Sequence, residues 1–217
     1  MSDSRLTISK TPTRKALAMV EYSAVSRGIT ALDIITKAAE VDILSSQTIC
    51  PGKYMILFCG GLGAVKAALE AARHVTGIID EFVLGRPHQS IFAALDRESP
   101  ISGKATIEGA STPTANTSCA SVLPYGGTAL GLVETFSGAA AIKAADTAAK
   151  TAWINLVEIH IAHGMCGKST VMFTGEVAAV SAALDAAKSE AEAKGMLLDT
   201  ALIPNPDKKM LAAIANR

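Results

Sequence analysis

A cysteine stands in the segment SQTICPGKY, residues 46–54, directly before Pro51 and Gly52. Turns that contain Gly and Pro usually carry Asn, Asp or Ser beside them, so a thiol at this place is unusual. A thiolate can bind a metal or act as a nucleophile, whereas a single cysteine in a turn is more often incidental. Cys50 is therefore the first residue whose chemistry needs an explanation.

A second segment, HIAHGMC at residues 160–166, places His160, His163 and Cys166 at intervals of three. Imidazole and thiolate are common zinc ligands. The segment is predicted to be a strand, however, and residues three apart on a strand point to opposite faces of the sheet. His160 and His163 therefore cannot both face one ion, and we interpret the segment as ordinary strand and loop.

The segment CGGLGAVK, residues 59–66, has the glycine spacing of a dinucleotide-binding turn but ends in Lys66, where Gly or Ala is required. It is predicted to be a structural turn from a strand to a helix. We find no Ser/His/Asp set and no paired carboxylates. Glu21 and Glu134 occupy equivalent strand positions and are interpreted as hydrogen-bonded structural groups, so the sequence predicts that the protein is not an enzyme.

The overall composition excludes several classes of partner. The 217 residues include 20 basic and 20 acidic side chains, which gives no formal net charge, and the basic residues do not cluster. Nucleic acid and anionic membrane surfaces are therefore not expected partners. No apolar run approaches the ~18 residues that a spanning helix needs. We expect the four cysteines to be reduced thiols, because the N-terminal segment does not read as a secretory signal.

The chain contains an internal repeat. Residues 16–39 align with residues 129–152, and residues 52–72 align with residues 167–187 after a slip of two residues. Ala16, Leu17, Val20, Glu21, Ala31, Asp33 and Lys37 correspond to Ala129, Leu130, Val133, Glu134, Ala144, Asp146 and Lys150. The pattern indicates a tandem duplication of one domain of about 85 residues.

Each unit is predicted to follow the order strand–helix–strand–strand–helix–strand, which is the ferredoxin-like order of an α+β domain. In the first unit we expect strands at 16–22, 41–49, 53–59 and 80–84 and helices at 26–38, 62–74 and 88–95, with Ser26 as the first N-cap. We expect an N-terminal arm at 1–14, a first domain at 15–95, a linker at 96–127 and a second domain at 128–217. The linker is assigned by its Ser, Thr, Gly, Ala and Pro content.

Both units resemble the bacterial microcompartment (BMC) shell domain. The first unit carries the segments LAMVE, ALDIITKAAEVDI and FCGGLGAVKAALEAA, and the units end in GRPHQSIFAAL and IPNPDKKMLAAI. The resemblance covers nearly the whole chain except the arm and the linker, and the order of strands and helices is the unpermuted one. Two such domains in one chain imply a pseudohexameric trimer, which is shaped like the family's single-domain hexamers.

Among tandem shell proteins, the segment TICPGK is similar to the iron–sulfur subtype of propanediol-utilisation shells. The resemblance implies that this turn lines a central pore and that three copies of Cys50 meet there on a threefold axis. Three thiolates at close range would repel one another, and a 4Fe–4S cluster removes that difficulty because its irons bind deprotonated sulfur. The fourth iron then takes water, a small molecule or another donor.

The resemblance also implies which other residues surround the pore. The expected pore-lining residues are Ile49, Cys50, Pro51, Gly52, Met165, Cys166 and Gly167. Cys166 aligns with Pro51, and Met165 aligns with Cys50. Cys166 is then a thiol beside the ligand set, an alternative ligand, or a spare residue. Cys59 and Cys119 are expected to be structural or incidental.

Three further residues match positions at the edges of shell hexamers. Lys37 and Lys150 match the lysine that pairs across neighbouring edges, and Arg86 matches the arginine of the family's R-P-H segment. In the second repeat, Asn205 stands at the position that corresponds to Arg86. The resemblance therefore implies tiling into a sheet with other copies and with other BMC shell proteins.

The expected function is a structural role in the microcompartment shell, in the cytoplasm, with electron transfer or redox sensing through the cluster and encapsulated redox enzymes as further partners. One alternative is a shell trimer without a cluster, whose open pore conducts a metabolite and is merely lined by Cys50. Another is a free redox or metal-binding enzyme on a ferredoxin-like fold. The sequence contains neither a CxxC pair nor an acid/base set, which counts against the free enzyme.

Overall fold

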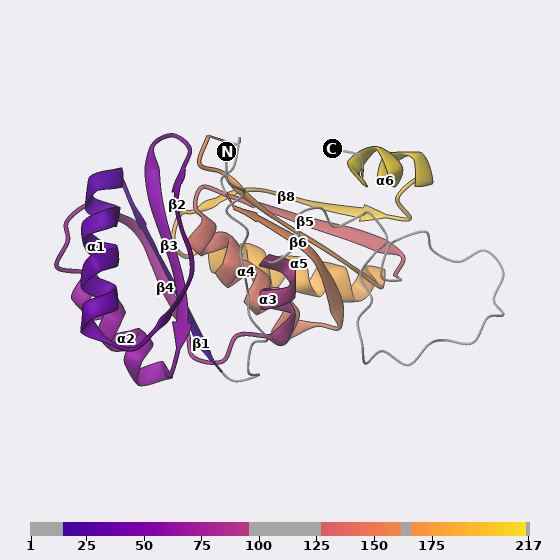
Figure 1. Cartoon of the computed structure of the whole chain (residues 1–217). Helices are drawn as coiled ribbons and strands as arrows, with labels where there is room; N and C mark the ends of the chain where they lie inside the picture. Colours follow the sequence, from indigo (N-terminus) through magenta and orange to yellow (C-terminus); the bar gives the residue numbers. More distant parts are fainter. Residues whose placement is uncertain (1–14, 96–126, 162–165, 216–217) are drawn as a thin grey trace.

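The two repeats form two four-stranded sheets that share a packed interior (Figure 1). The computed structural model describes residues 15–95, 127–161 and 166–215. The first repeat contains β1 (Ala16–Tyr22), α1 (Val25–Ala38), β2 (Asp42–Ile49), β3 (Lys53–Gly60), α2 (Leu62–Ala72), β4 (Ile78–Leu84) and α3 (Gln89–Leu95). The second contains β5 (Ala129–Thr135), α4 (Gly138–Thr151), β6 (Ile154–Ile161), β7 (Ser169–Gly175), α5 (Val177–Glu192), β8 (Leu197–Pro204) and α6 (Lys208–Ala215).

Both sheets are antiparallel and have the same strand order. The first sheet runs β2-β3-β1-β4 and the second runs β6-β7-β5-β8, which is the ferredoxin-like arrangement. The register of the central pair is also the same, since Ala16 lies opposite Gly60 and Ala129 lies opposite Gly175. The prediction of two α+β units in tandem is confirmed. The expected N-terminal arm and residues 96–126 of the expected linker lie outside the described residues.

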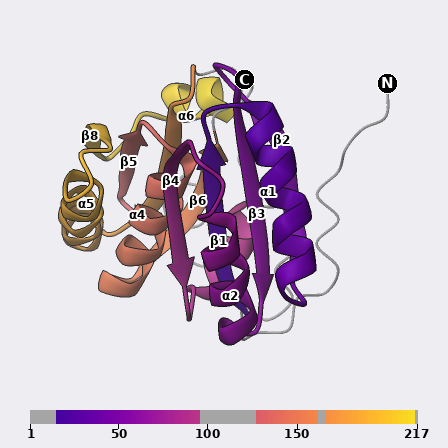
Figure 2. The ribbon, with the colours of Figure 1, turned by 90° about the vertical axis from the view of Figure 1, so that its left-hand side faces the viewer.

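The central strand β1 is buried along its whole length because its alternate side chains face two different layers. Ala18, Val20 and Tyr22 pack with residues of α1 and α2. Leu17 and Met19 point the other way and belong to a cluster that includes residues of the second repeat. Figure 2 shows α1 and α2 on one side of this sheet and the second repeat on the other.

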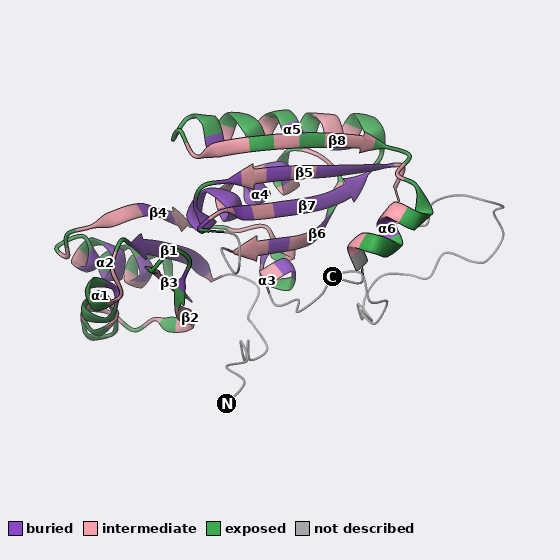
Figure 3. Ribbon diagram, turned by 90° about the horizontal axis from the view of Figure 1, so that it is seen from above, coloured by how far each residue is buried: buried purple, intermediate pink, exposed green. Residues whose placement is uncertain are grey.

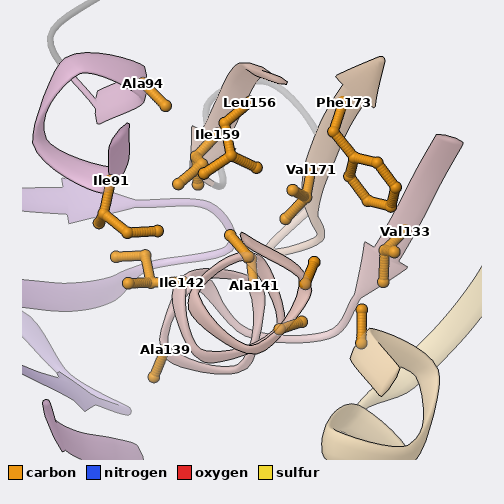
Figure 4. Packing of buried hydrophobic residues seen from close by; sticks show 14 of the residues in the cluster. Ile91, Ala94, Val133, Ala139, Ala141, Ile142, Leu156, Ile159, Val171 and Phe173 are labelled. Carbon is orange, nitrogen blue, oxygen red and sulfur yellow. The ribbon is translucent and has the colours of Figure 1, made fainter. Parts of the chain in front are cut away.

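Helix α4 fills the space between the two sheets. Its buried residues are Gly138, Ala139, Ala140, Ala141, Ile142, Ala144, Ala145, Asp146 and Ala148. Small side chains let the backbone of a helix approach both neighbours closely, which explains why this segment is so rich in alanine. Figure 4 shows Ile142 of α4 beside Ile91 of α3, and Figure 3 shows that α1, its counterpart, is largely exposed.

Two local predictions for the first repeat need correction. Helix α1 begins at Val25 with Ala24 in the N-cap position, so the expected N-cap at Ser26 is wrong. Ala24 has the extended backbone conformation of an N-cap residue, so the helix begins one residue earlier than expected and Ser26 already lies inside its first turn. Helix α2 ends at Ala72, two residues before the expected end, because Arg73 and His74 form a closing turn.

The glycine-rich segment at residues 59–66 has the predicted structure. β3 ends at Gly60, Gly61 is the N-cap of α2, and the helix begins at Leu62. The segment is therefore a structural turn from a strand to a helix. Among the described helices, none is both long and apolar enough to cross a lipid bilayer.

Candidate functional site

Cys50 lies at the tip of the tight turn between β2 and β3. The turn is closed by a hydrogen bond of 3.0 Å from the backbone N–H of Gly52 to the carbonyl of Ile49. Gly52 has a φ of +93°, which favours glycine, and the Cys50–Pro51 peptide bond is cis. Ile49 is buried with 1% exposure, whereas Cys50 is an exposed free thiol. A rigid strand pair thus presents this sulfur to the outside of the chain.

The equivalent turn of the second repeat connects β6 and β7 and carries the second exposed thiol, Cys166. Cys166 and Gly167 have φ values of 52° and 86°, both in the left-handed region. Gly167 is buried, and the next residues pass directly into β7. Met165 and His163 lie outside the described residues.

The two turns touch each other within one chain. A Cβ atom placed on Gly167 would lie 2.9 Å from the carbonyl oxygen of Cys50 and 3.3 Å from Cδ of Pro51. Glycine is therefore required at this position both by its φ and by the approach of the neighbouring turn. The sequence placed both turns at the same kind of position, but only the structure shows that they pack together. In the sequence, the alignment of Gly52 with Gly167 was the signal that each turn contains a required glycine.

A buried ion pair lies behind the turns. The ammonium of Lys53 lies 3.6 Å from Oε2 of Glu21 and donates a hydrogen bond of 3.3 Å to the carbonyl of Phe136. Oε1 of Glu21 accepts a hydrogen bond of 3.0 Å from the backbone N–H of Ala139, at the start of α4. Burial raises the pKa of Glu21, and this effect exceeds the opposing influence of Ala139 and Lys53.

Glu21 is thus a hydrogen-bonded structural group, as the sequence predicted. It also connects the first repeat to the second. A neighbouring connection strengthens the same joint: the hydroxyl of Ser137 donates to Asp80, and the ammonium of Lys194 lies 2.7 Å from the other oxygen of Asp80. These contacts join the first repeat to the second.

The two exposed thiols of the described residues suit a soft metal. Two exposed thiols, Cys50 and Cys166, lie on contacting turns, and thiolates are the usual ligands of iron–sulfur clusters. Within residues 15–95, 127–161 and 166–215, no group of three or more His, Cys, Asp or Glu side chains is arranged to hold a metal ion. Among these described residues, Cys50 and Cys166 do not by themselves complete a metal site.

The remaining candidate ligands lie elsewhere. Cys59 is buried in β3 with 1% exposure, and burial raises the pKa of its thiol, so it suits packing better than metal binding. His160 on β6 has Nδ1 at 3.8 Å from Oε1 of Glu158, on its own strand. Cys119 lies outside the described residues.

The candidate edge residues lie on exposed surface. Lys37 is 74% exposed and its ammonium lies 2.7 Å from the carboxylate of Asp33, one helical turn away. Lys150 makes the same pair with Asp146, which also accepts a hydrogen bond of 2.7 Å from the backbone N–H of His88. Arg86 is exposed in the segment before α3.

The repeats also match a known domain family. The family model of the BMC domain matches residues 16–87 and 129–206. The bacterial microcompartment shell protein PduT of Citrobacter freundii is 33% identical over 198 residues, which cover 90% of this chain and 95% of that protein. The carboxysome shell protein CsoS1A of Hydrogenovibrio crunogenus is 34% identical over 88 residues, which cover 38% of this chain and 92% of that protein.

A solved structure supports the same relationship. The crystal structure of a microcompartment protein from Desulfitobacterium hafniense DCB is 37% identical, with a TM-score of 0.70, and the likeness covers 91% of this chain and 98% of that one. Two matched segments, each with its own four-stranded sheet, account for the internal repeat. The chain therefore belongs to the BMC-domain family of shell proteins and carries two copies of the domain.

Proposed function

We propose that this chain is a structural component of a bacterial microcompartment shell, and that three copies surround a central pore where their Cys50 thiols hold a 4Fe–4S cluster. The observation that carries the proposal is the exposed thiol of Cys50 on a closed two-strand turn. The likeness to PduT over most of both chains supports the shell role. Such a protein acts by assembly within a cytoplasmic microcompartment and not by catalysis.

The chain's own residues prepare the site in three ways. Gly52 and the buried Ile49 fix the direction of the turn that carries Cys50. Gly167 lets the second turn pack against the Cys50 backbone, which limits the movement of the thiol. The Lys53 ammonium lies just behind the turn and contributes positive charge near a group of thiolates.

A bound cluster would supply one-electron transfer or redox sensing across the shell. Cys50 from each copy would provide three protein ligands, which leaves one iron for water, a small molecule or another donor. Cys166 is the other exposed thiol on the contacting turns. It would lie beside the ligand set as a substitute donor or as an uninvolved neighbour.

The edge residues provide the second part of the proposal. Lys37, Lys150 and Arg86 would join neighbouring particles, both copies of this protein and other BMC shell proteins, into a flat layer. Single surface ion pairs contribute little, about 0–1 kcal/mol, but a layer repeats the same contact at every edge. Redox enzymes inside the compartment would be the electron partners of the pore.

The test is the iron and acid-labile sulfide content of anaerobically purified wild-type protein, Cys50→Ala and Cys166→Ala. We expect iron and sulfide in wild type, none in Cys50→Ala, and most of the wild-type content in Cys166→Ala. Full cluster content in Cys50→Ala would rule out this site, and loss in Cys166→Ala alone would move it to the second turn. A colourless wild-type protein that still forms layers would indicate an open pore lined by Cys50.

A further inference from the structure

Cys166 has a backbone conformation that its residue type rarely adopts. Its φ is 52°, in the left-handed region, where side chains other than those of glycine, asparagine and aspartate are uncommon. Among the described residues with positive φ, the others are glycines and Asn205. Cys166 is also not a copy of Cys50, because it aligns with Pro51 of the first repeat. A thiol therefore occupies a position that glycine or asparagine would fill with less strain, which indicates a chemical role for its sulfur.

The backbone that follows Cys166 packs directly on the turn that carries Cys50. Gly167 is buried, and a Cβ atom placed on it would lie 2.9 Å from the carbonyl oxygen of Cys50 and 3.3 Å from Cδ of Pro51. The Cα atoms of a disulfide are usually about 4.4–6.8 Å apart, a separation that two contacting turns reach by small adjustments. Both side chains are exposed, so a small reagent can reach both sulfurs.

The third described cysteine, Cys59, does not compete for this chemistry. It lies near the end of β3, whereas the turn with Cys50 precedes the start of that strand, and it is 1% exposed. Burial raises the pKa of its thiol, which lowers the fraction of thiolate, the form that attacks a disulfide. Cys50 and Cys166 are therefore the two described thiols that are both accessible and close to each other.

We propose that Cys50 and Cys166 of one chain form a reversible disulfide bond when the turns hold no metal cluster. The oxidant is a low-molecular-weight disulfide such as oxidised glutathione. The thiolate of one cysteine attacks a sulfur of this oxidant, which breaks its S–S bond and releases one small thiol. The thiolate of the other cysteine attacks the mixed disulfide, forms the Cys50–Cys166 bond and releases a second small thiol. Two protons and two electrons thus pass from the protein thiols to the oxidant.

The bond and the proposed cluster exclude each other, because both use the sulfur of Cys50. A strained and exposed disulfide is easily reduced, so a small thiol returns the pair to the form that can bind iron. The inference goes beyond the proposed function, since it requires neither the cluster nor a given number of copies. It rests on that proposal only for the exclusion of one state by the other.

The test uses the full chain after removal of metal with a chelator and reduction with dithiothreitol. The protein is incubated with oxidised glutathione and then denatured in N-ethylmaleimide, and its intact mass is measured. The chain has four cysteines, so we expect four maleimide groups before oxidation and two after it. Proteolytic fragments joined through Cys50 and Cys166, together with a single-chain band on non-reducing electrophoresis, would identify a bond within the chain.

Substitutions separate this bond from unspecific oxidation. Cys50→Ser and Cys166→Ser each leave one exposed thiol, which is expected to retain a glutathione adduct, whereas Cys119→Ser is expected to form the bond as wild type does. Gly167→Ala keeps both thiols but forces the turns apart, so we expect the equilibrium constant for the bond against glutathione to fall about tenfold. Gly195→Ala is the control and should leave this constant unchanged, because its Cβ meets nothing within 4 Å.

The outcomes distinguish this inference from the proposed function. Four maleimide groups on oxidised wild-type protein, a bond through another cysteine, or a bond that joins two chains would overturn the inference and leave the cluster proposal intact. An unchanged equilibrium constant in Gly167→Ala would also overturn it. Protein that retains its iron is expected to keep four maleimide groups in the same buffer. A Cys50–Cys166 bond in that iron-loaded protein would instead remove Cys50 from the cluster site, while the inference stands.

Discussion

The side-chain carboxylate of Glu21 accepts a hydrogen bond from the backbone N–H of Ala139, and the distance from Oε1 to N is 3.0 Å. Glu21 belongs to β1 of the first repeat, and Ala139 belongs to the first turn of α4 in the second. The start of a helix carries partial positive charge, which favours a carboxylate there. The other oxygen, Oε2, has no hydrogen-bond partner in the described part of the chain and lies 3.6 Å from the Lys53 ammonium. One buried carboxylate thus connects β1 of the first repeat to α4 of the second.

This carboxylate predicts a specific pH dependence. Burial raises the pKa of Glu21 above its ordinary value, so the folded protein holds a proton at pH values where the unfolded chain has lost it. Stability therefore falls as pH rises from the unfolded pKa to the folded pKa and is constant above it. Glu21→Gln mimics the protonated form, and we expect the variant to lack this decline. Urea unfolding between about pH 4 and pH 8 measures this change in the free energy of unfolding.

The comparison needs a surface carboxylate as its control. Glu70 is 67% exposed and pairs with Arg73 on the outside of α2, so Glu70→Gln is expected to follow the wild-type curve. All measurements use one protein concentration, because association shifts apparent stability. If the free energy of unfolding differs between Glu21→Gln and wild type by the same amount at every pH, the raised pKa of Glu21 does not contribute to folding.

The contact between the two turns can be measured with a pair of glycines. Gly167 has a φ of 86°, and its added Cβ would meet the carbonyl oxygen of Cys50. Gly195 has a φ of 66° but would meet nothing within 4 Å. Alanine at either position costs about 1–2 kcal/mol of backbone strain. We expect Gly167→Ala to cost more than Gly195→Ala and to lower iron content, although no thiol is removed. Equal losses of stability with unchanged iron would show that the turns are independent.

Sequence patterns predicted the elements well because those patterns are local. Strand alternation and the aligned repeat gave two α+β units, and the bounds of β1 agree with the expected strand at 16–22. The predicted N-cap of α1 was wrong because Ser26 has the side chain of a cap residue, whereas the extended backbone that precedes the helix ends at Ala24.

The relation between the repeats could not be predicted in this way. An alanine-rich helix such as α4 has few large side chains that could identify its partner. The first sheet, which it contacts, lies more than 100 positions away in sequence, since Glu21 and Ala139 are 118 positions apart. The contact of Gly167 with the Cys50 turn is of the same kind. The alignment of the repeats pairs Gly52 with Gly167, and the structure shows that Gly167 must be glycine because the Cys50 turn lies against it.

The edge assignment predicts a defect in layers and not in particles. Lys37 is 74% exposed, and Asp33, its neighbour on α1, is also exposed, so Lys37→Ala leaves no buried charge unpaired. We expect the variant to keep the wild-type particle mass and to form smaller or disordered layers in electron micrographs. Lys66→Ala, on the exposed side of α2, is the control and should form layers normally. Normal layers from Lys37→Ala would remove this residue from the edge contact.

The most direct test of the account is native mass spectrometry of the anaerobically purified protein. The account predicts a particle of three chains of 22.3 kDa with the additional mass of one 4Fe–4S cluster, and the same particle without that mass for Cys50→Ala. Because one substitution removes the Cys50 thiol from every copy, no set of Cys50 ligands remains, and Cys166 is the one described thiol on the contacting turn that could substitute. A trimer of wild-type protein without added mass, or a Cys50→Ala trimer that retains it, would contradict the assignment of a cluster to Cys50.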